Sequence, residues 1–487
     1  MELELENWYD AFKSKDSKFD GRFFVGVLST GIYCRPVCKA RLPKQENTTF
    51  YQSAAAAERD GFRPCLLCRP ELAPHDYLYE RGSLANKAAR IFDEQCSDGL
   101  NISEIANLLQ CSDRHLRRLF IKEYGVTPLQ YLQTRHLLLA KNLLTDTKLS
   151  ILEVALASGF RSLRSFNEAF KKHYHLAPLA FRKKTKNDIE TTSQITLFLD
   201  YRPPYRWDDV LAYFKKKALV DVELIKDNAY WRTVGFYKDN HEYVSGWLCV
   251  KQATKRNALT LTIDEKLLDI LPLLLMRTRL VFDIDSQPDF IFAKLNSLNT
   301  IEANTFKLGT RLPGSYDAFE TLVKELFKKY YSVKRVAQLL KIIVENYGVR
   351  LLENITGLNY TFPLPEKIVS LSLNELIEQG FVEEEAQLLI SIATKFLSQN
   401  FDFDYAINPL EEIEKIAQVF DLTLAEAQQI SLHLMCWPDI FIASQLNNNK
   451  FNLLAIENDL EKLKKEWHPF SSYAMISLIN KDLNKER

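Results

Sequence analysis

The chain has 487 residues, too many for one hydrophobic core, so we expect about three or four domains. Hydrophobic residues make up 46% and charged residues 26%, as in ordinary globular proteins, and no apolar run is long enough to cross a membrane. The acidic start, MELELENWYD, lacks the apolar core of a secretion signal, so we expect a cytoplasmic protein without membrane contact.

The zero net charge of the whole chain hides an uneven distribution along it. Residues 1–81 are balanced, residues 82–186 carry a net charge of +8, and residues 187–487 carry −8. A basic segment favours a polyanionic partner, whereas an acidic segment does not. The sequence therefore predicts nucleic-acid binding in the middle of the chain.

Four of the eight cysteines form two closely spaced pairs near the start of the chain: Cys34, Cys38, Cys65 and Cys68. Three residues separate the first pair, two separate the second, and 26 lie between the pairs. This spacing is typical of a tetrahedral tetrathiolate zinc site. A disulfide or redox pair is the weaker alternative in a chain without an export signal. Zinc that only holds a small domain together, as in a zinc ribbon, stays open on spacing alone.

The residues around the two cysteine pairs, called the first and second knuckle below, favour one of these kinds of site. The stretches TGIYCRPVCKAR, NTTFY and GFRPCLLCRP resemble the N-terminal domain of the bacterial Ada family over about residues 15–75. The resemblance implies that Cys34 accepts a methyl group from a methylated DNA phosphate. The basic residues beside it, Arg35, Lys39 and Arg41, are expected to hold neighbouring phosphates.

The implied chemistry is physically consistent with a zinc-bound thiolate. Zinc keeps a thiolate deprotonated at neutral pH, and the thiolate is the nucleophile. A cluster of four thiolates carries a charge of about −2, which repels a phosphodiester but not a neutral methyl phosphotriester. The thioether product is not regenerated, so each molecule reacts once. The cluster then falls to about −1, and we expect DNA affinity to rise.

Residues 82–186 are predicted to be helical and to contain two units of the same organisation, 102–125 and 151–175. The stretch ASGFRSLRSFNEAFKKHYHLAPLAFRK resembles the AraC-type DNA-binding family. The resemblance implies two helix-turn-helix units joined by a linker helix near 129–144, with recognition helices near 113–124 and 162–173. The predicted DNA contacts are Arg114, Arg117, Arg118, Arg161, Arg164 and Asn167. A helical bundle with solvated charges is the alternative.

Beyond a polar linker, residues 195–290 show the period-two alternation of strands, as in ALTLTIDEKLL, and residues 300–480 show helical periodicity. The stretches LDYRPPYRWDDVLAYFKKKAL, RLPGSYDAFETLVKELF and EWHPFSSYAMISLI resemble the AlkA-type 3-methyladenine DNA glycosylases. We expect one helix over 321–335, and we expect residues 195–487 to fold on their own.

The catalytic features implied by that resemblance are missing from this sequence. The family carries a Gly-x-Gly hairpin whose amides hold a DNA phosphate. The matching segment, 419–437, contains no glycine, and Gln445 stands where the family has its catalytic aspartate. Asp439 lies six residues earlier, at a non-catalytic position. A neutral amide cannot stabilise an oxocarbenium-like transition state, so we predict a glycosylase fold without excision chemistry.

Together these patterns predict an α+β multidomain protein. Its parts are a small zinc methyl-acceptor domain (1–80), an all-helical double helix-turn-helix domain (82–186), a linker (187–194), a β-sheet subdomain (195–295) and a helical helix-hairpin-helix glycosylase-like domain (296–487).

The predicted function is one-shot transfer of a methyl group from a DNA methyl phosphotriester to a zinc-bound cysteine, which switches on sequence-specific transcription. The expected partners are double-stranded DNA and RNA polymerase, and the expected cofactor is zinc. One alternative is an active DNA-3-methyladenine glycosylase II with DNA-targeting modules. The other is a zinc-containing transcription factor without methyl chemistry.

Overall fold

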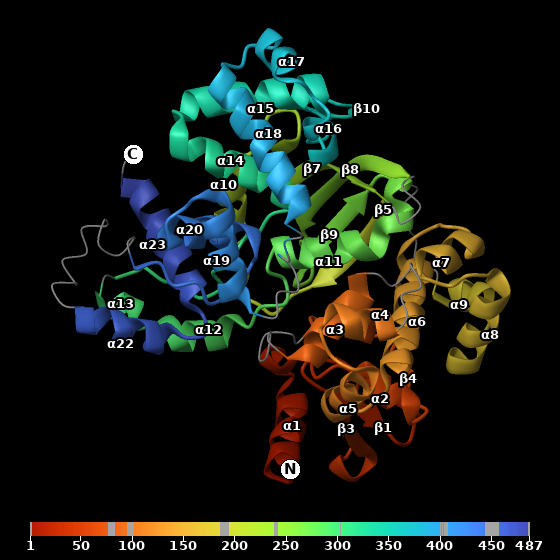
Figure 1. The fold of residues 1–487 in the computed structure, drawn as a ribbon. Helices are drawn as coiled ribbons and strands as arrows, with labels where there is room; N and C mark the ends of the chain where they lie inside the picture. Colours follow the sequence, from red (N-terminus) through yellow and green to blue (C-terminus); the bar gives the residue numbers. More distant parts are fainter. Residues whose placement is uncertain are drawn as a thin grey trace.

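The computed structural model describes residues 2–75, 83–94, 102–185, 194–237, 242–301, 303–399, 401, 403, 408–443 and 457–485. The predicted linker, apart from residue 194, and Gln445 lie outside the described residues. The zinc domain (2–75) and the double helix-turn-helix domain (83–185) occupy one side of the molecule in Figure 1. The glycosylase-like part (194–485) forms the centre and the other side. Among the described helices, none combines the length and apolar character needed to cross a bilayer.

The zinc domain is built on a four-stranded sheet of order β3-β1-β2-β4, in which the short β4 runs parallel to β2. Its elements are α1 (Glu2–Ser14), η1 (Ser17–Phe19), β1 (Phe24–Val27), β2 (Ile32–Cys34), η2 (Gln45–Asn47), β3 (Thr48–Tyr51), α2 (Ala54–Arg59), β4 (Arg63–Pro64) and η3 (Pro70–Leu72). The buried Phe12, Phe23 and Val25 pack in one apolar cluster with the cysteine knuckles. The sheet therefore fixes the knuckles against a small hydrophobic core.

The described residues of the double helix-turn-helix domain form seven helices: α3 (Leu84–Glu94), α4 (Ile102–Leu108), α5 (Asp113–Tyr124), α6 (Pro128–Asp146), α7 (Ile151–Ala157), α8 (Leu163–Tyr174) and α9 (Pro178–Thr185). The side chains of Ser112 and Ser162 accept backbone N–H groups at the starts of α5 and α8. Gly125 adopts a φ of 73°, which ends α5 in the left-handed conformation that glycine tolerates. These local signals place both recognition helices within a residue of their predicted bounds.

The glycosylase-like part begins with a five-stranded antiparallel sheet of order β5-β9-β8-β7-β6. The strands are β5 (Ile195–Asp200), β6 (Glu223–Lys226), β7 (Ala229–Tyr237), β8 (Tyr243–Gln252) and β9 (Ala258–Ile263). They are accompanied by α10 (Trp207–Lys217), η4 (Glu265–Ile270) and α11 (Leu271–Val281). Leu197 and Leu199 point into the core, whereas Phe198 between them is only half-buried, as the period-two pattern predicts.

The helical portion that follows contains α12 (Pro288–Leu295), α13 (Leu298–Ile301), α14 (Ala318–Tyr330), α15 (Val333–Tyr347), α16 (Pro365–Val369), α17 (Leu373–Glu378), α18 (Glu383–Ser398), α19 (Pro409–Phe420), α20 (Leu424–Leu434), α22 (Glu457–Trp467) and α23 (Ser471–Lys485). The prediction of one helix over 321–335 is wrong. Tyr331 is extended, and the Ser332 side chain caps the start of α15, so two helices meet there.

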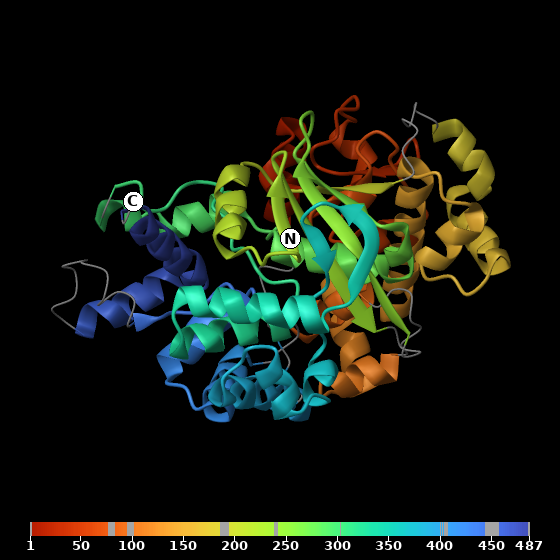
Figure 2. The same cartoon turned by 90° about the horizontal axis from the view of Figure 1, so that it is seen from above.

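A second departure is a β-hairpin inside the segment predicted to be helical. It comprises β10 (Arg350–Ile355) and β11 (Leu358–Tyr360), and Gly357 in its turn has a φ of 94°. Leu351 and Ile355 pack against Trp231 and the buried Trp247 of the five-stranded sheet. Figure 2 shows this hairpin lying over the sheet. The gain from covering these tryptophans outweighs the helical preference of the flanking sequence.

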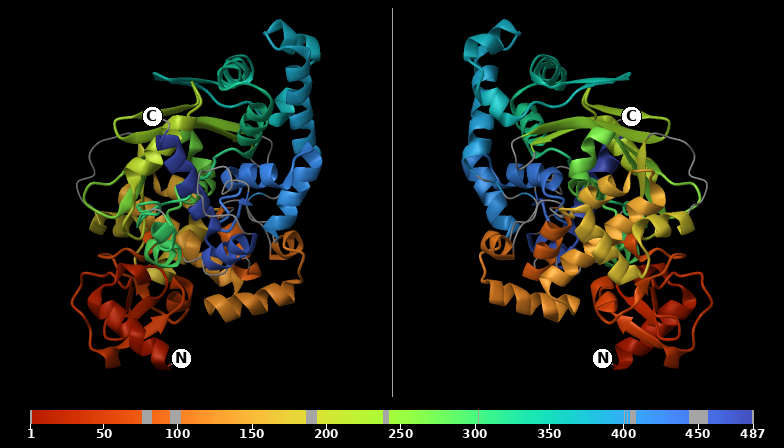
Figure 3. Two further views of the ribbon diagram at one scale, coloured as in Figure 1. Left: turned by 90° about the vertical axis from the view of Figure 1, so that its left-hand side faces the viewer. Right: turned by 90° about the vertical axis from the view of Figure 1, so that its right-hand side faces the viewer.

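The fold class is confirmed as α+β and multidomain, but the largest hydrophobic core crosses a predicted boundary. One apolar cluster includes Leu137, Leu143 and Phe170 of the helix-turn-helix domain together with Leu197 of β5 and Tyr473 of α23. Helix α11 of the glycosylase-like part also packs along α3. Figures 1 and 3 place the zinc domain and α17 at opposite ends of this continuous body. Residues 195–487 therefore share a hydrophobic core with the helix-turn-helix domain, which speaks against the expectation that they fold on their own. The predicted domain limits stay predictions.

Candidate metal centre and DNA-binding surface

Two strands bring the cysteine knuckles together. Strand β2 ends at Cys34, and the amide of Cys38 then donates to the Arg35 carbonyl oxygen in a tight turn (3.1 Å). Strand β4 runs directly into Cys65, whose amide donates to the Tyr33 carbonyl oxygen at 2.9 Å. This parallel pairing holds the first ligand of each knuckle side by side.

The sulfur atoms of Cys34, Cys38, Cys65 and Cys68 all lie within 4.8 Å of one another. Tetrahedral zinc with four sulfur ligands at about 2.3 Å requires such a spacing. Cys38 is 2%, Cys34 5% and Cys65 8% exposed, and Cys68 is half-buried. Three buried thiols and one half-buried thiol, none of them in a disulfide, fit a tetrathiolate metal site, and zinc would hold them as thiolates.

One sulfur accepts a backbone hydrogen bond from the other knuckle. The amide of Arg35, the residue after Cys34, donates to the Cys68 sulfur at 3.3 Å. An N–H donor withdraws charge from a thiolate, so this bond makes the Cys68 sulfur a weaker nucleophile.

The three basic residues of the first knuckle have different surroundings. Lys39 and Arg41 are exposed beside the cluster, where they are free to meet an anion. Arg35 is 5% exposed, and its guanidinium donates to carboxylates of Asp20 and Asp200. Burial alone lowers the pKa of Arg35, but the two carboxylates outweigh it and raise that pKa. A phosphate contact by Arg35 stays a prediction, and in this structure carboxylates take that place.

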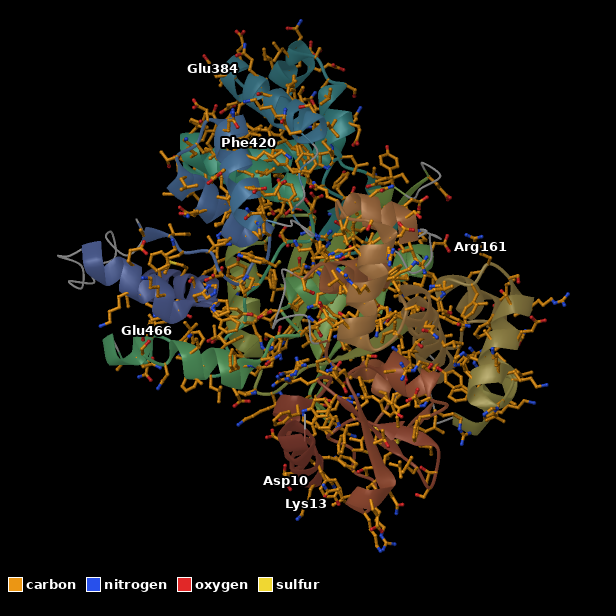
Figure 4. All side chains as sticks on the ribbon, turned by 60° about the horizontal axis from the view of Figure 1, so that its bottom comes forward. Asp10, Lys13, Arg161, Glu384, Phe420 and Glu466 are labelled. Atoms are coloured by element: carbon orange, nitrogen blue, oxygen red, sulfur yellow. The ribbon has the colours of Figure 1, made fainter. Side chains whose placement is uncertain are left out.

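The predicted DNA-contacting residues of the two recognition helices lie on the surface. Five are exposed: Arg114, Arg117, Arg118, Arg161 and Arg164. Asn167 is half-buried, and its amide donates to the Leu163 carbonyl oxygen at 2.8 Å. Figure 4 shows Arg161 at the outer edge of the molecule, between α7 and α8. The opposite faces of the helices, including Leu116, Phe120, Phe166 and Phe170, are buried. The orientation needed for major-groove insertion is therefore present.

Buried ion pairs fasten the zinc domain to the linker helix α6. Arg69, next to the ligand Cys68, donates to both carboxylate oxygens of Asp146 at 2.7 and 2.8 Å. Glu71 accepts from Lys141, and both side chains are 1% exposed. Such pairs lose much more when one partner is removed than exposed pairs do.

A second link joins the first cysteine knuckle to recognition helix α8. The hydroxyl of Tyr33 donates to buried Glu58 at 3.0 Å, and the other Glu58 oxygen lies 3.6 Å from Nδ1 of His173. Burial raises the pKa of Glu58 to about 8, although Tyr33 partly offsets this effect. Sequence reasoning missed this cluster because its members come from three separated segments with no motif.

The helix-hairpin-helix element consists of α19, the turn 421–423 and α20. Asp421 adopts a φ of 53° in the turn, where the related family uses glycine. The Thr423 hydroxyl accepts the amide of Glu426, and the Glu426 carboxylate accepts the amide of Thr423 at 2.8 Å. Lys329 pairs with Glu426 at 3.1 Å. The carboxylate of Glu426 therefore lies at the start of α20, the helix end that attracts anions.

Asp439, predicted to stand at a non-catalytic position, contacts the start of a helix. Its carboxylate accepts the hydroxyl of Ser471 at 2.6 Å and the amide of the same residue at 3.3 Å, at the start of α23. Nδ1 of His468 lies 2.5 Å from the other oxygen. These contacts are those of a helix cap. The substitution predicted at Gln445 lies outside the described residues and stays a prediction.

Comparison with known families matches three successive segments of the chain. The metal binding domain of Ada matches residues 7–71, a helix-turn-helix domain matches 105–184, and the AlkA N-terminal domain matches 196–317. The first match, together with the four clustered sulfurs, confirms zinc as the cofactor.

Similar proteins cover both halves of the chain. A probable bifunctional transcriptional activator/DNA repair enzyme AlkA of Mycobacterium tuberculosis is 28% identical over 97% of this chain and 96% of its own length. The bifunctional transcriptional activator/DNA repair enzyme AdaA of Bacillus subtilis is 31% identical over 38% of this chain and 86% of its own length. DNA-3-methyladenine glycosylase 2 of Escherichia coli is 24% identical over 58% of this chain and 95% of its own length.

Proposed function

Because the chain belongs to the family of bifunctional transcriptional activators and DNA repair enzymes, we propose that Cys34 accepts one methyl group from a methylated phosphate of double-stranded DNA. The observation that carries the proposal is the cluster of four cysteine sulfurs within 4.8 Å. Zinc, when bound, keeps the sulfurs deprotonated. The place of Cys34, as the first cysteine of the first knuckle within the segment that matches the metal binding domain of Ada, supports Cys34 as the acceptor.

The transfer is a simple displacement. The Cys34 sulfur attacks the methyl carbon of a neutral phosphotriester, the carbon–oxygen bond breaks, and its electron pair stays on the phosphate oxygen. A thioether and an ordinary phosphodiester result. Exposed Lys39 and Arg41 hold flanking phosphates. These contacts position the methyl carbon against the Cys34 sulfur but do not change the reactivity of that carbon.

The test uses the full chain and a duplex with one methyl phosphotriester. Intact mass spectrometry should show the gain of one methyl group, and peptide mapping should place it on Cys34. Cys34→Ser should take up none, whereas Cys111→Ser, a change of a cysteine outside the cluster, should react like the unaltered protein. A methyl group on Cys65 or Cys68, or no uptake at all, would overturn the proposal.

We further propose that methylation switches on transcription. The cluster loses one negative charge, and a unit charge about 6 Å from a phosphate interacts by roughly 3 kcal/mol at an effective dielectric of about 20. Salt screens this term. The methylated protein should therefore bind its promoter more tightly at low salt, with the two recognition helices in the major groove and RNA polymerase recruited beside them. An equal Kd before and after methylation would exclude the electrostatic switch, and run-off transcription with purified polymerase tests recruitment.

For the glycosylase-like part we propose DNA-repair ancestry without base excision. The hairpin lacks glycine, and the amides at the start of α20 already bond to Thr423 and Glu426. Asp421 adds a further negative charge where a phosphate would approach. These features support a domain that keeps the fold for another purpose.

A further inference from the structure

The guanidinium of Arg35 links the methyl-acceptor knuckle to the glycosylase-like part. Arg35 directly follows Cys34 in the sequence, and its Nη1 atom donates to the Cys68 carbonyl oxygen at 3.1 Å. The same atom donates to a carboxylate oxygen of Asp200 at 2.7 Å, across 165 positions of sequence. On its other edge, Nε donates to Asp20 of the zinc domain at 2.8 Å. Nη2 also donates to Asp20, so each of the three guanidinium nitrogens has a partner.

Asp200 is the last residue of β5 and lies between two arginines. Its oxygens accept Nη2 of Arg256 at 2.6 and 2.8 Å, in addition to Nη1 of Arg35. The Asp200 side chain is 9% exposed, whereas Arg256 is 32% exposed. Two carboxylates and two guanidinium groups thus form a neutral set across the junction, so both arginines are compensated without DNA.

Other contacts hold the two parts together at the same place. Arg202 donates to the carbonyl oxygen of His75 at 3.3 Å, and the amide of His75 donates to Asp285 at 2.7 Å. Asp200 therefore reaches Arg35 as part of a docked surface, not as an isolated side chain.

A carboxylate and a phosphate compete for the same edge of a guanidinium. Both accept charge-assisted N–H bonds, and both are anionic at neutral pH. The contested Nη1 atom lies next to the sulfur cluster, since it also donates to the Cys68 carbonyl oxygen at 3.1 Å. A DNA phosphate that uses Arg35 must first displace the carboxylate of Asp200.

We propose that Asp200 is an internal competitor of the DNA phosphate for Arg35, so that the glycosylase-like part tunes methyl acceptance at Cys34. Asp200 is then a positioning residue that acts through Arg35. The inference rests on the proposed methyl transfer, and it assigns a regulatory use to a part of the chain whose excision features are lost.

The test measures methyl uptake by the full chain as a function of the concentration of methylated duplex. Asp200→Asn should lower the half-saturating concentration about ten-fold, with the maximal rate unchanged. Ten-fold corresponds to about 1.4 kcal/mol, within the range of one charge-assisted hydrogen bond. Asp200→Glu keeps the carboxylate and should stay close to the unaltered protein. Asp208→Asn makes the same charge change at an exposed residue of the same part and should have no effect.

A second variant, expected to change the half-saturating concentration in the opposite direction, tests the inference if Asp200→Asn folds poorly. Arg256→Met removes the second partner of Asp200 and leaves its carboxylate to Arg35 alone, so the half-saturating concentration should rise. Lys255→Met, the loss of an exposed neighbouring charge, is its matched control and should raise that concentration less.

Methyl iodide separates competition from structural damage. The Cys34 sulfur attacks its carbon and iodide leaves, so no phosphate is involved. Zinc content and the rate with methyl iodide should be the same in every variant. An unchanged or higher half-saturating concentration in folded Asp200→Asn overturns the inference, as does an Arg256→Met value equal to or below that of Lys255→Met. Absence of uptake from DNA by the unaltered protein overturns the proposed function instead.

Discussion

The cysteine knuckles and the helix-hairpin-helix turn are both short loops built to bring a reactive or anionic group close to the backbone. In the knuckles every metal ligand is in place: four sulfurs lie within 4.8 Å of one another, and the Cys68 sulfur accepts the amide of Arg35. In the hairpin the helices remain, but the turn residue is Asp421 instead of glycine, and the Glu426 carboxylate accepts the amide of Thr423. Packing of apolar helix faces therefore persists independently of the few polar residues that carry chemistry.

Removal of zinc should produce the largest difference between the two regions. Structural zinc contributes on the order of 10 kcal/mol to small domains, which exceeds the stability that so small a core supplies. Chelation should unfold the zinc domain and leave amide protection in β7 and β8 intact. Metal analysis should find one zinc per chain in the unaltered protein and in Cys249→Ser, but none in Cys38→Ser. Native protection of β1 after chelation would contradict this prediction.

The glycosylase-like part should show no base excision, in contrast to the reactive cysteine knuckles. The loss of one preorganised catalytic group costs about 2.7–4 kcal/mol, or about 10² to 10³ in rate. The full chain should therefore release no 3-methyladenine above background from alkylated DNA. Gln445→Asp alone should restore little, because the hairpin still lacks glycine. Heat-denatured protein is the control. Robust release of 3-methyladenine by the unaltered protein would show that the hairpin region also keeps its chemistry and would contradict this prediction.

The two regions should also respond to pH in opposite directions. Burial raises the pKa of Glu58 from 4.5 to about 8, so the folded state retains a proton that the unfolded chain releases. Its contribution to stability is complete below pH 4.5 and is lost as the pH rises to about 8. Burial, assisted by Lys217, lowers the pKa of His433 from 6.5 to about 3. Its contribution is present above pH 6.5 and is lost as the pH falls.

Each of these groups changes the free energy of unfolding by at most about 1.4 kcal/mol per pH unit. Urea unfolding across this range should show a smaller fall with rising pH in Glu58→Gln. His433→Gln should show a smaller loss at acidic pH. If both variants follow the unaltered protein at every pH, neither buried group titrates as described.

The smallest expected effect compares two helix caps. Ser162→Ala and Thr423→Ala each remove a hydroxyl that accepts a backbone N–H, at a cost of about 1 kcal/mol. Only Ser162→Ala should also weaken promoter binding in a gel-shift assay, because α8 is a recognition helix and α20 does not face a phosphate. Weaker promoter binding by Thr423→Ala would show that the hairpin still contacts DNA.

Sequence signals sufficed wherever the determinant is local. The spacing of Cys34 to Cys68 identified the zinc ligands, and the AraC-type motif placed both recognition helices within a residue of their observed bounds. Apolar periodicity separated the five-stranded sheet from the helical portion. In each case the residues that fix the structure lie within a few positions of one another or form a known motif.

Features that depend on distant partners could not be predicted. Arg35 reads as a surface residue until the fold brings Asp200 to it, and Glu58 meets His173 only after two domains dock. The β10–β11 hairpin forms because the sheet offers Trp231 and Trp247 to cover. No local pattern in these segments encodes the partner.

The apolar cluster shared by α6, α8 and β5 has a consequence for how the molecule can be taken apart. The two parts are joined by the chain between Thr185 and Ile195, yet buried leucines and phenylalanines on both sides hold them together as a subunit interface would. A protease cut between these residues should therefore leave a nicked molecule that elutes as one species. When the two fragments are expressed separately, each should expose its apolar side of the shared cluster to solvent. When they are coexpressed, they should associate into a complex with the fold of the intact protein.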